Sequence, residues 1–202
     1  MKALVLTVLI TFAAGTRAQT AVIYSGVQDI PIPTNFEGVS VNIFDLTSFD
    51  GDPAPDWSDS QVNFFFGGDG VFSGPRFLPV RTGTGATDPI LSLMPGDLVE
   101  TISLTGPGGN GASQDHIGNA LGQFPSGVES YLGFKLDLTG SGDFVNGFMR
   151  VTLTNGSSEG LIHDWAYSDT PGETITVGVI PEPSTPVLVG ALGLALAFRR
   201  KR

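Results

Sequence analysis

The sequence contains no cysteine, which excludes disulfide bonds, thiolate metal sites and thiol catalysis together. A domain built from this chain must therefore be stabilised by core packing. Histidine is nearly as scarce, because only His116 and His163 occur and neither belongs to a zinc-binding motif. No GxSxG motif is present, and Asp164 is expected on the opposite strand face from its neighbour His163. A catalytic triad is therefore not predicted.

Basic residues are rare in the middle of the chain. Lys2 and Arg17 lie near the N-terminus, and residues 199–202 are all basic. The stretch between these ends holds four basic and twenty acidic residues, a formal balance of −16. Such a body repels polyanions, so nucleic acid is not an expected partner.

The N-terminal end has the composition of a secretory signal peptide. Lys2 is followed by an apolar run at residues 3–14. Thr16 and Ala18 then supply small residues at the −3 and −1 positions of a cleavage site. The run is short for a membrane-spanning helix, which favours a removed signal over an anchor. Residues 1–18 are therefore predicted to direct export. The alternative is a buried N-terminal strand or helix.

The C-terminal end combines three features in a fixed order. A proline-rich motif comes first, followed by an unbroken apolar run at residues 187–198 and a basic terminus. As a helix this run spans about 18 Å, against about 30 Å for a hydrocarbon core, so it crosses a bilayer only marginally. The basic end is expected to stay cytoplasmic. The motif is Pro181, Glu182, Pro183, Ser184 and Thr185, and the basic end is Arg199, Arg200, Lys201 and Arg202.

This order of motif, short apolar helix and basic end resembles the PEP-CTERM sorting signal, over roughly the last 22 residues. The resemblance implies an exosortase, a membrane-embedded processing enzyme of Gram-negative-type bacteria that make extracellular polysaccharide. It also implies a transient anchor in the inner membrane, followed by transfer to the cell surface or extracellular matrix. The alternative is a permanent single-pass anchor that is not processed.

Alternating apolar and polar residues predict strands along the body, residues 19–178. The clearest run is 131–138, where Leu132, Phe134 and Leu136 alternate with smaller or more polar residues. One face of this strand is expected to be covered and the other to face water. The further predicted strands are residues 21–27, 39–43, 62–66, 98–104, 148–154, 161–167 and 174–179.

Turn sequences rich in Gly, Asp, Asn and Pro separate these runs, and only residues 113–121 favour a turn or two of helix. Many short strands at this spacing predict an all-β fold, an antiparallel β-sandwich or jelly-roll-like ectodomain. The predicted organisation is a signal peptide at 1–18, this ectodomain at 19–178 and the sorting tail at 179–202, with its short transmembrane helix.

The last part of the body also resembles the end of the ectodomain in many sorted proteins of this class. The matching positions are a YxGF strand, an NGFxR strand and a DWAYxDTPGExI ending. The resemblance implies a domain class without an established activity. The residues that carry it are Tyr131, Gly133, Phe134, Asn146, Gly147, Phe148, Arg150 and the segment 164–175.

Calcium is the one metal for which the sequence offers a candidate site, and no other cofactor is expected. Asp50, Asp52, Asp56 and Asp59 fall in one loop, and carboxylate oxygens are the ligands that Ca²⁺ prefers. The spacing departs from an EF-hand, because Ala54 stands where that loop has a ligand. A solvated acidic loop is the favoured interpretation.

Aromatic residues raise the hypothesis of a sugar-stacking surface. His163, Trp165 and Tyr167 share one strand face by parity, although core packing is the commoner fate of a strand Trp. Trp57, Tyr24 and Tyr131 are further candidates. Three functions stay open: a non-enzymatic structural or interaction protein, a carbohydrate-binding module for extracellular polysaccharide, and a glycoside-active enzyme using paired carboxylates. The first is preferred.

Overall fold

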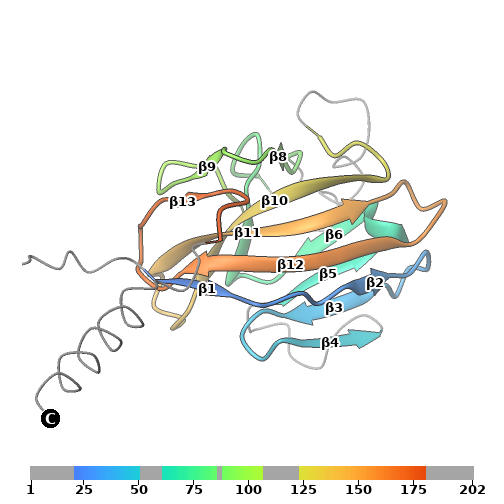
Figure 1. Ribbon diagram of the computed structural model, residues 1–202, viewed down its shortest axis with the longest axis horizontal. Coiled ribbons are helices and arrows are strands. Elements are labelled where there is room, and N and C mark those ends of the chain that lie inside the picture. Colours follow the sequence, from blue (N-terminus) through green and yellow to red (C-terminus); the bar gives the residue numbers. More distant parts are fainter. Residues whose placement is uncertain (1–20, 51–60, 86–87, 107–122, 181–202) are drawn as a thin grey trace, which may run out of the picture.

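The computed structural model describes residues 21–50, 61–85, 88–106 and 123–180 (Figure 1). This part is all-β with antiparallel pairing, as predicted, and its single helical element is the 3₁₀ turn η1 (Phe66–Gly68). In these ranges no helix has the length and apolar character to cross a membrane. The predicted signal peptide, the helical turn at 113–121 and the motif and apolar run of the tail lie outside the described residues.

The largest sheet has seven strands, and its central path runs in the order β1-β12-β11-β10-β7. β2 also pairs with β12, and β8 also pairs with β10. The long strands β10, β11 and β12 form its centre (Figure 1). The strands are β1 (Val22–Tyr24), β2 (Ile30–Ile32), β7 (Phe77–Pro79), β8 (Ser92–Leu93), β10 (Val128–Asp137), β11 (Phe144–Leu153) and β12 (Gly160–Ser168).

Two smaller sheets accompany the large one. A four-stranded sheet in the order β4-β3-β5-β6 is built from β3 (Val39–Asn42), β4 (Thr47–Asp50), β5 (Gln61–Phe65) and β6 (Gly70–Ser73). A two-stranded sheet pairs β9 (Leu98–Val99) with β13 (Ile175–Thr176).

The main core lies between the large sheet and the four-stranded sheet. Alternate residues of β10 point into it, as the period-2 pattern predicts, and the Phe134 ring stacks on Phe77 with centroids 4.6 Å apart. Trp165 is fully buried there. This face of the large sheet is called the inner face below. Other members of the main core are Val41, Val62 and Phe64 from the four-stranded sheet, and Leu132, Leu136, Val145, Met149, Val151 and Ile162 from the large sheet.

The opposite, outer face of the large sheet is partly covered, which corrects the expectation that it faces water. A second apolar cluster packs β9 and β13 onto β11 and β12. Gly133 of β10 is buried under this layer, and a Cβ there would lie 2.6 Å from Leu93 Cδ1 and 2.9 Å from Val99 Cγ2. Glycine thus permits close packing of the layer. The cluster consists of Val80, Val99, Phe148, Ala166, Ile175 and Val177.

Strand ends differ from the predicted ones where the chain must turn. β5 stops at Phe65, because Phe66 adopts a left-handed φ of 52° and begins η1, so it does not continue the inward pattern of Val62 and Phe64. β9 and β13 are shorter than predicted, since turns follow them directly.

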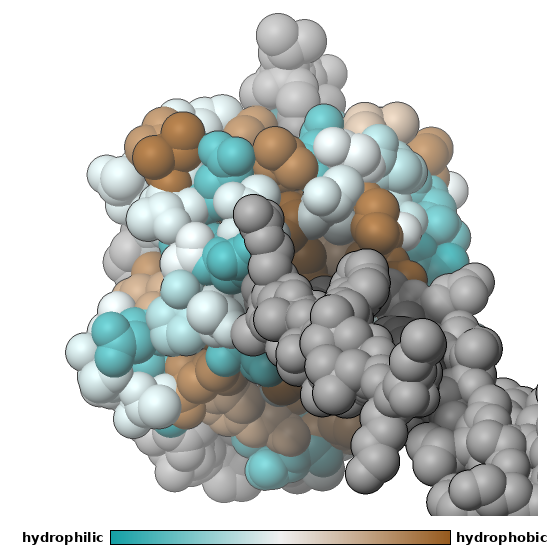
Figure 2. All heavy atoms as spheres, turned by 60° about the vertical axis from the view of Figure 1, so that its left-hand side comes forward, coloured by the Kyte–Doolittle hydropathy of each residue, from teal (hydrophilic) through white to brown (hydrophobic). Residues whose placement is uncertain are grey.

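In Figure 2, separate apolar spots alternate with polar residues on the face shown.

Candidate functional site

A β-bulge in β12 determines which side chains meet on the outer face. Arg150 of β11 pairs with Asp164, whereas Val151 pairs with Ile162, so His163 is an extra residue on β12. Ile162 and Trp165 both point into the inner core. His163 and Asp164 between them therefore both lie on the outer face.

This bulge overturns two predictions made from strict alternation. Asp164 does not lie on the opposite face from His163, and His163 does not share a face with Trp165 and Tyr167. Trp165 and Tyr167 belong to the inner core, as the core-packing interpretation holds, so they form no exposed platform. Tyr24 and Tyr131 keep partial exposure.

Asp164 is the centre of a charged network on this face. Its side chain is 3% exposed and its Oδ2 accepts hydrogen bonds from Arg150, including one from Nε at 3.1 Å. The Tyr24 hydroxyl donates to the same oxygen at 3.2 Å. Arg150 also reaches Glu129, with Nη1 at 3.4 Å from Oε2. These bonds link β1, β12, β11 and β10.

The network shifts the titration of its own members. The hydrogen bond to Asp164 raises the pKa of Arg150 further above its usual range, against the effect of burial. Burial and then the negative charge of Asp164 raise the pKa of the Tyr24 hydroxyl. Both groups are therefore held in their protonated forms, as hydrogen-bond donors.

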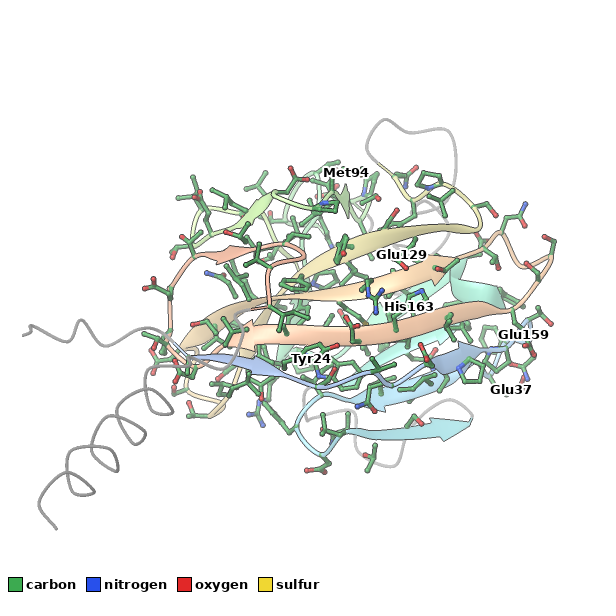
Figure 3. The ribbon with its side chains drawn as sticks, in the orientation of Figure 1. Tyr24, Glu37, Met94, Glu129, Glu159 and His163 are labelled. Carbon is green, nitrogen blue, oxygen red and sulfur yellow. The ribbon has the colours of Figure 1, made fainter. Side chains whose placement is uncertain are left out.

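His163 lies beside this network, between Glu129 and Tyr24 in Figure 3. Its Nε2 is 2.9 Å from Thr152 Oγ1 and 3.7 Å from Glu129 Oε2, and its Nδ1 is 3.6 Å from Asp29 Oδ1. Hydroxyl, imidazole and carboxylate thus occur in the order of a hydrolase triad. The Nδ1–Oδ1 distance exceeds hydrogen-bond length. Thr152 lies on β11, whose amides are paired with strands on both sides, so they are not available as an oxyanion hole.

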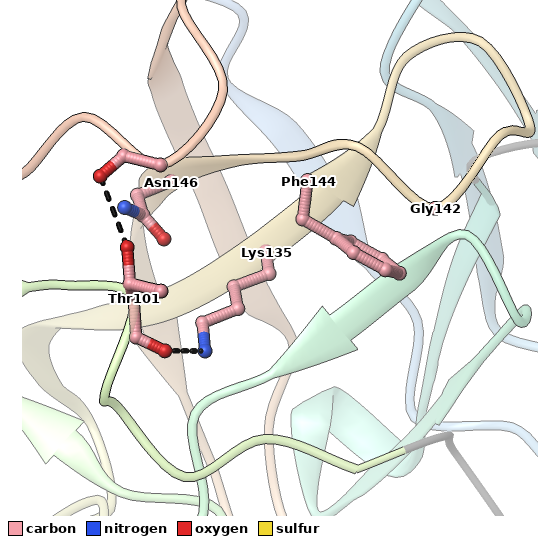
Figure 4. Close-up of a pocket in the computed structure, with 6 residues that line it drawn as sticks. Thr101, Lys135, Gly142, Phe144 and Asn146 are labelled. Carbon is pink, nitrogen blue, oxygen red and sulfur yellow. Dashed lines mark hydrogen bonds between the residues drawn. The ribbon is translucent and has the colours of Figure 1, made fainter.

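The outer face also has a hollow of about 200 Å³, apart from the Asp164 network (Figure 4). Lys135 and Asn146, which are direct cross-strand partners on β10 and β11, supply polar groups to it. The Phe144 ring supplies an apolar wall. The lining residues are Thr101, Lys135, Gly142, Phe144, Asn146 and Gly172.

Three hydrogen bonds tie the sheet to the loops that border this hollow. Lys135 Nζ donates to the backbone oxygens of Thr101 and Ser103, each at 2.7 Å. Asn146 Nδ2 donates to the Glu173 carbonyl at 2.6 Å. Burial lowers the pKa of Lys135, because the charged ammonium loses hydration. The side chains that line the hollow therefore also position its rim.

Asp137 fixes the β10–β11 turn that carries Gly142. Its Oδ1 accepts from the amides of Thr139 and Gly140, and its Oδ2 accepts from the amide of Gly142 at 2.9 Å. Burial alone would raise its pKa, but the three amides and the charge of Arg76 outweigh it and hold the pKa below its ordinary value. Gly140 and Gly142 have φ of 77° and 88°, which explains glycine at both positions.

Of the four predicted calcium ligands, only the backbone of Asp50 lies in the part of the chain that the structure describes. The backbone of Asp50 ends β4, whereas Asp52, Asp56 and Asp59 lie outside the described residues, as do Trp57 and His116. The sorting residues Pro181–Thr185 and Arg199–Arg202 lie outside them too. Within the described ranges, no group of three His, Asp or Glu side chains is arranged to hold a metal ion.

Sequence reasoning did not identify the hollow, although one signal was available. The turn at residues 140–143 joins two predicted strands, and pairing them across it places Lys135 opposite Asn146. Six residues of the ectodomain resemblance lie on the outer face: Tyr131, Gly133, Asn146, Phe148, Arg150 and Asp164. Others, such as Phe134 and Trp165, belong to the main core.

Comparison with known proteins gave no match: none of the protein-family models, the curated proteins or the solved structures is significantly similar to this chain.

Proposed function

We propose that this protein is exported, held briefly in the inner membrane by its tail, and transferred to the cell surface or extracellular matrix, where it has a non-enzymatic structural or interaction role. The observation that carries the proposal is the order of the Pro181–Thr185 motif, the apolar run 187–198 and the basic end 199–202. The partners that this implies are an exosortase-type processing enzyme and the inner membrane.

The physical chemistry of the tail supports transient anchoring. Pro181 and Pro183 keep the peptide around Glu182 extended, which suits the cleft of a processing enzyme. The apolar run is too short for a comfortable span, so it retains the protein only weakly. The basic end opposes passage through the bilayer. A weak anchor suffices for an intermediate that is soon cleaved.

The composition and fold of the body are consistent with export under this proposal. We propose a jelly-roll-like β-sandwich ectodomain between a cleaved signal peptide and a short C-terminal transmembrane helix. Its two larger sheets share a core without needing disulfide bonds. Its excess of acidic side chains favours solubility.

Replacing Pro181 and Pro183 by Ala tests the sorting function. The variant is expected to accumulate as a larger, membrane-retained species, because the enzyme loses its extended recognition element while the anchor persists. Replacing Arg199–Arg202 by neutral residues is expected to release unprocessed protein into the periplasm. Fractionation and immunoblotting of the native host give the readout, with Pro125→Ala/Pro171→Ala in exposed loops as the matched control. Normal surface delivery of the Pro181/Pro183 variant would contradict the proposal.

Carbohydrate binding is the second candidate function, and the hollow beside Phe144 favours it. An aromatic ring together with amide and ammonium groups is the combination that orients a hydroxylated ligand in a small site. The proposed partner is extracellular polysaccharide. A glycan array probed with the purified protein tests this role, and binding to a defined glycan is the expected result. An array without binding would leave the structural role alone.

A further inference from the structure

We propose that the hollow lined by Lys135, Phe144 and Asn146 binds a single neutral pyranose unit of a polysaccharide. This inference rests on the second candidate function, carbohydrate binding, and names the site and the ligand class for it.

The first support is the hydrogen-bonding capacity that remains at Lys135. Its ammonium has three N–H donors, and two of them serve the carbonyls of Thr101 and Ser103. Among the described residues no carboxylate forms an ion pair with it. One donor is thus left for a ligand oxygen at the edge of the hollow (Figure 4).

The second support is Asn146, which is 1% exposed. Its Nδ2 is used by the Glu173 carbonyl, whereas its Oδ1 accepts no hydrogen bond from the described residues. Figure 4 shows this oxygen on the side of Thr101 and Lys135, within the group that lines the hollow. A buried amide oxygen favours a partner that can donate, and a sugar hydroxyl can do so.

The third support is the wall formed by Phe144. Its ring is half-buried and lies on the far side of Lys135 from Asn146 (Figure 4). One face of a pyranose carries mainly C–H groups and packs on an aromatic ring, while its hydroxyls point outward to polar partners. The donor, the acceptor and the apolar wall together match the edges and face of one sugar ring.

Size and charge narrow the ligand further. The volume of about 200 Å³ lies below the ~300 Å³ at which pockets for drug-sized molecules begin, so one ring fits rather than an oligosaccharide. The ammonium of Lys135 is already solvated by two carbonyls, and the body has a formal charge of −16. This field disfavours an acidic sugar and favours a neutral one.

The test uses saturation-transfer difference NMR on the full-length chain with methyl glucoside, methyl mannoside, methyl galactoside and methyl glucuronide. We expect one neutral methyl pyranoside to bind with a Kd near the millimolar range, and the glucuronide to bind at least fivefold more weakly. Phe144→Leu keeps apolar volume but loses the ring, and should weaken binding at least fivefold. Phe144→Trp enlarges the stacking surface and should tighten it. Phe36→Leu, an exposed position outside the lining, is the matched control.

The outcomes separate the site from the function. If neither the array nor the neutral pyranosides show binding, both the inference and the carbohydrate-binding function are wrong. If the array is positive but Phe144→Leu binds as the wild type does, only the assignment to this hollow is overturned. Tighter binding of the glucuronide than of every neutral sugar overturns the neutral class. Melting curves of each variant verify folding, and Phe144→Leu decides alone if the Trp variant does not fold.

Discussion

The two faces of the large sheet use the same strands for different purposes. The inner face is a continuous apolar core, in which Phe77, Phe134 and Trp165 are fully buried. The outer face combines the apolar contact with β9 and β13, the Asp164 network and the hollow at Lys135. The inner face therefore holds the main apolar core, whereas the outer face combines apolar packing with charged and polar side chains.

The difference shows how each face is specified. The inner face follows from alternation alone, because apolar residues at every second position of a strand point the same way. The outer face depends on strand register, on a bulge at His163 and on loops distant in sequence. Its polar groups meet only after the fold forms.

The largest expected effect comes from the inner face. Phe134→Ala removes a fully buried ring that stacks on Phe77, and should lower the free energy of unfolding by about 3–5 kcal/mol. Urea denaturation measures the loss. Val128→Ala on the same strand, 50% exposed, should change stability by less than about 0.5 kcal/mol. Equal losses in the two variants would mean that the inner face is not the core.

Adding a methyl group on each face compares how tightly the two are packed. A Cβ at Gly147 would lie 2.5 Å from the Phe134 ring and 2.8 Å from the Ala166 carbonyl oxygen, whereas at Gly133 it meets only side-chain methyls. Gly147→Ala should therefore cost about 3 kcal/mol, and Gly133→Ala about 1 kcal/mol. Thermal denaturation ranks the two variants. The reverse order would show that the outer layer is the more rigid one.

The outer network should contribute less than the core but more than a surface ion pair. Arg150→Ala leaves the Asp164 carboxylate, which is 3% exposed, without its main partner, and should cost about 2 kcal/mol. A double-mutant cycle with Asp164→Asn isolates the coupling between the two side chains. A coupling energy near zero would indicate that solvent replaces Arg150 without cost.

The smallest effect is a pH dependence at Asp137. Because the folded state holds its pKa below the ordinary value of about 3.9, the ionised group stabilises the fold above that pH, and this stabilisation is lost as the pH falls through the folded pKa. Asp137→Asn should cost about 1 kcal/mol at pH 7 and progressively less below about pH 4. Urea titrations at several pH values measure this, with Asp143→Asn on the exposed turn as control. A pH-independent cost would contradict the sign.

Much of the fold was predictable, because alternation is a local signal. The strands around residues 39–43, 131–138, 148–154 and 161–167 were all placed correctly, and so was their antiparallel pairing. The prediction that the second face of strand 131–138 is open to water was wrong. The sequence does not show that β9 and β13 pack over part of this face.

The candidate site was largely unpredictable for a related reason. A single extra residue in β12 reverses the parity of everything before it, so His163 joins Asp164 and not Trp165. The hydrogen bonds of Lys135 to Thr101 and Ser103 span more than thirty residues. The motif of the tail could be identified from the sequence, because it consists of consecutive residues and does not depend on how distant segments pack.

The most direct test of the sorting function is the intact mass of the protein extracted from the cell surface of its host. Removal of the tail predicts a species that starts after the signal peptide and lacks residues 187–202. A surface protein that still carries the apolar run and the basic end Arg199–Arg202 would contradict processing. The tail would then be interpreted as a permanent single-pass anchor.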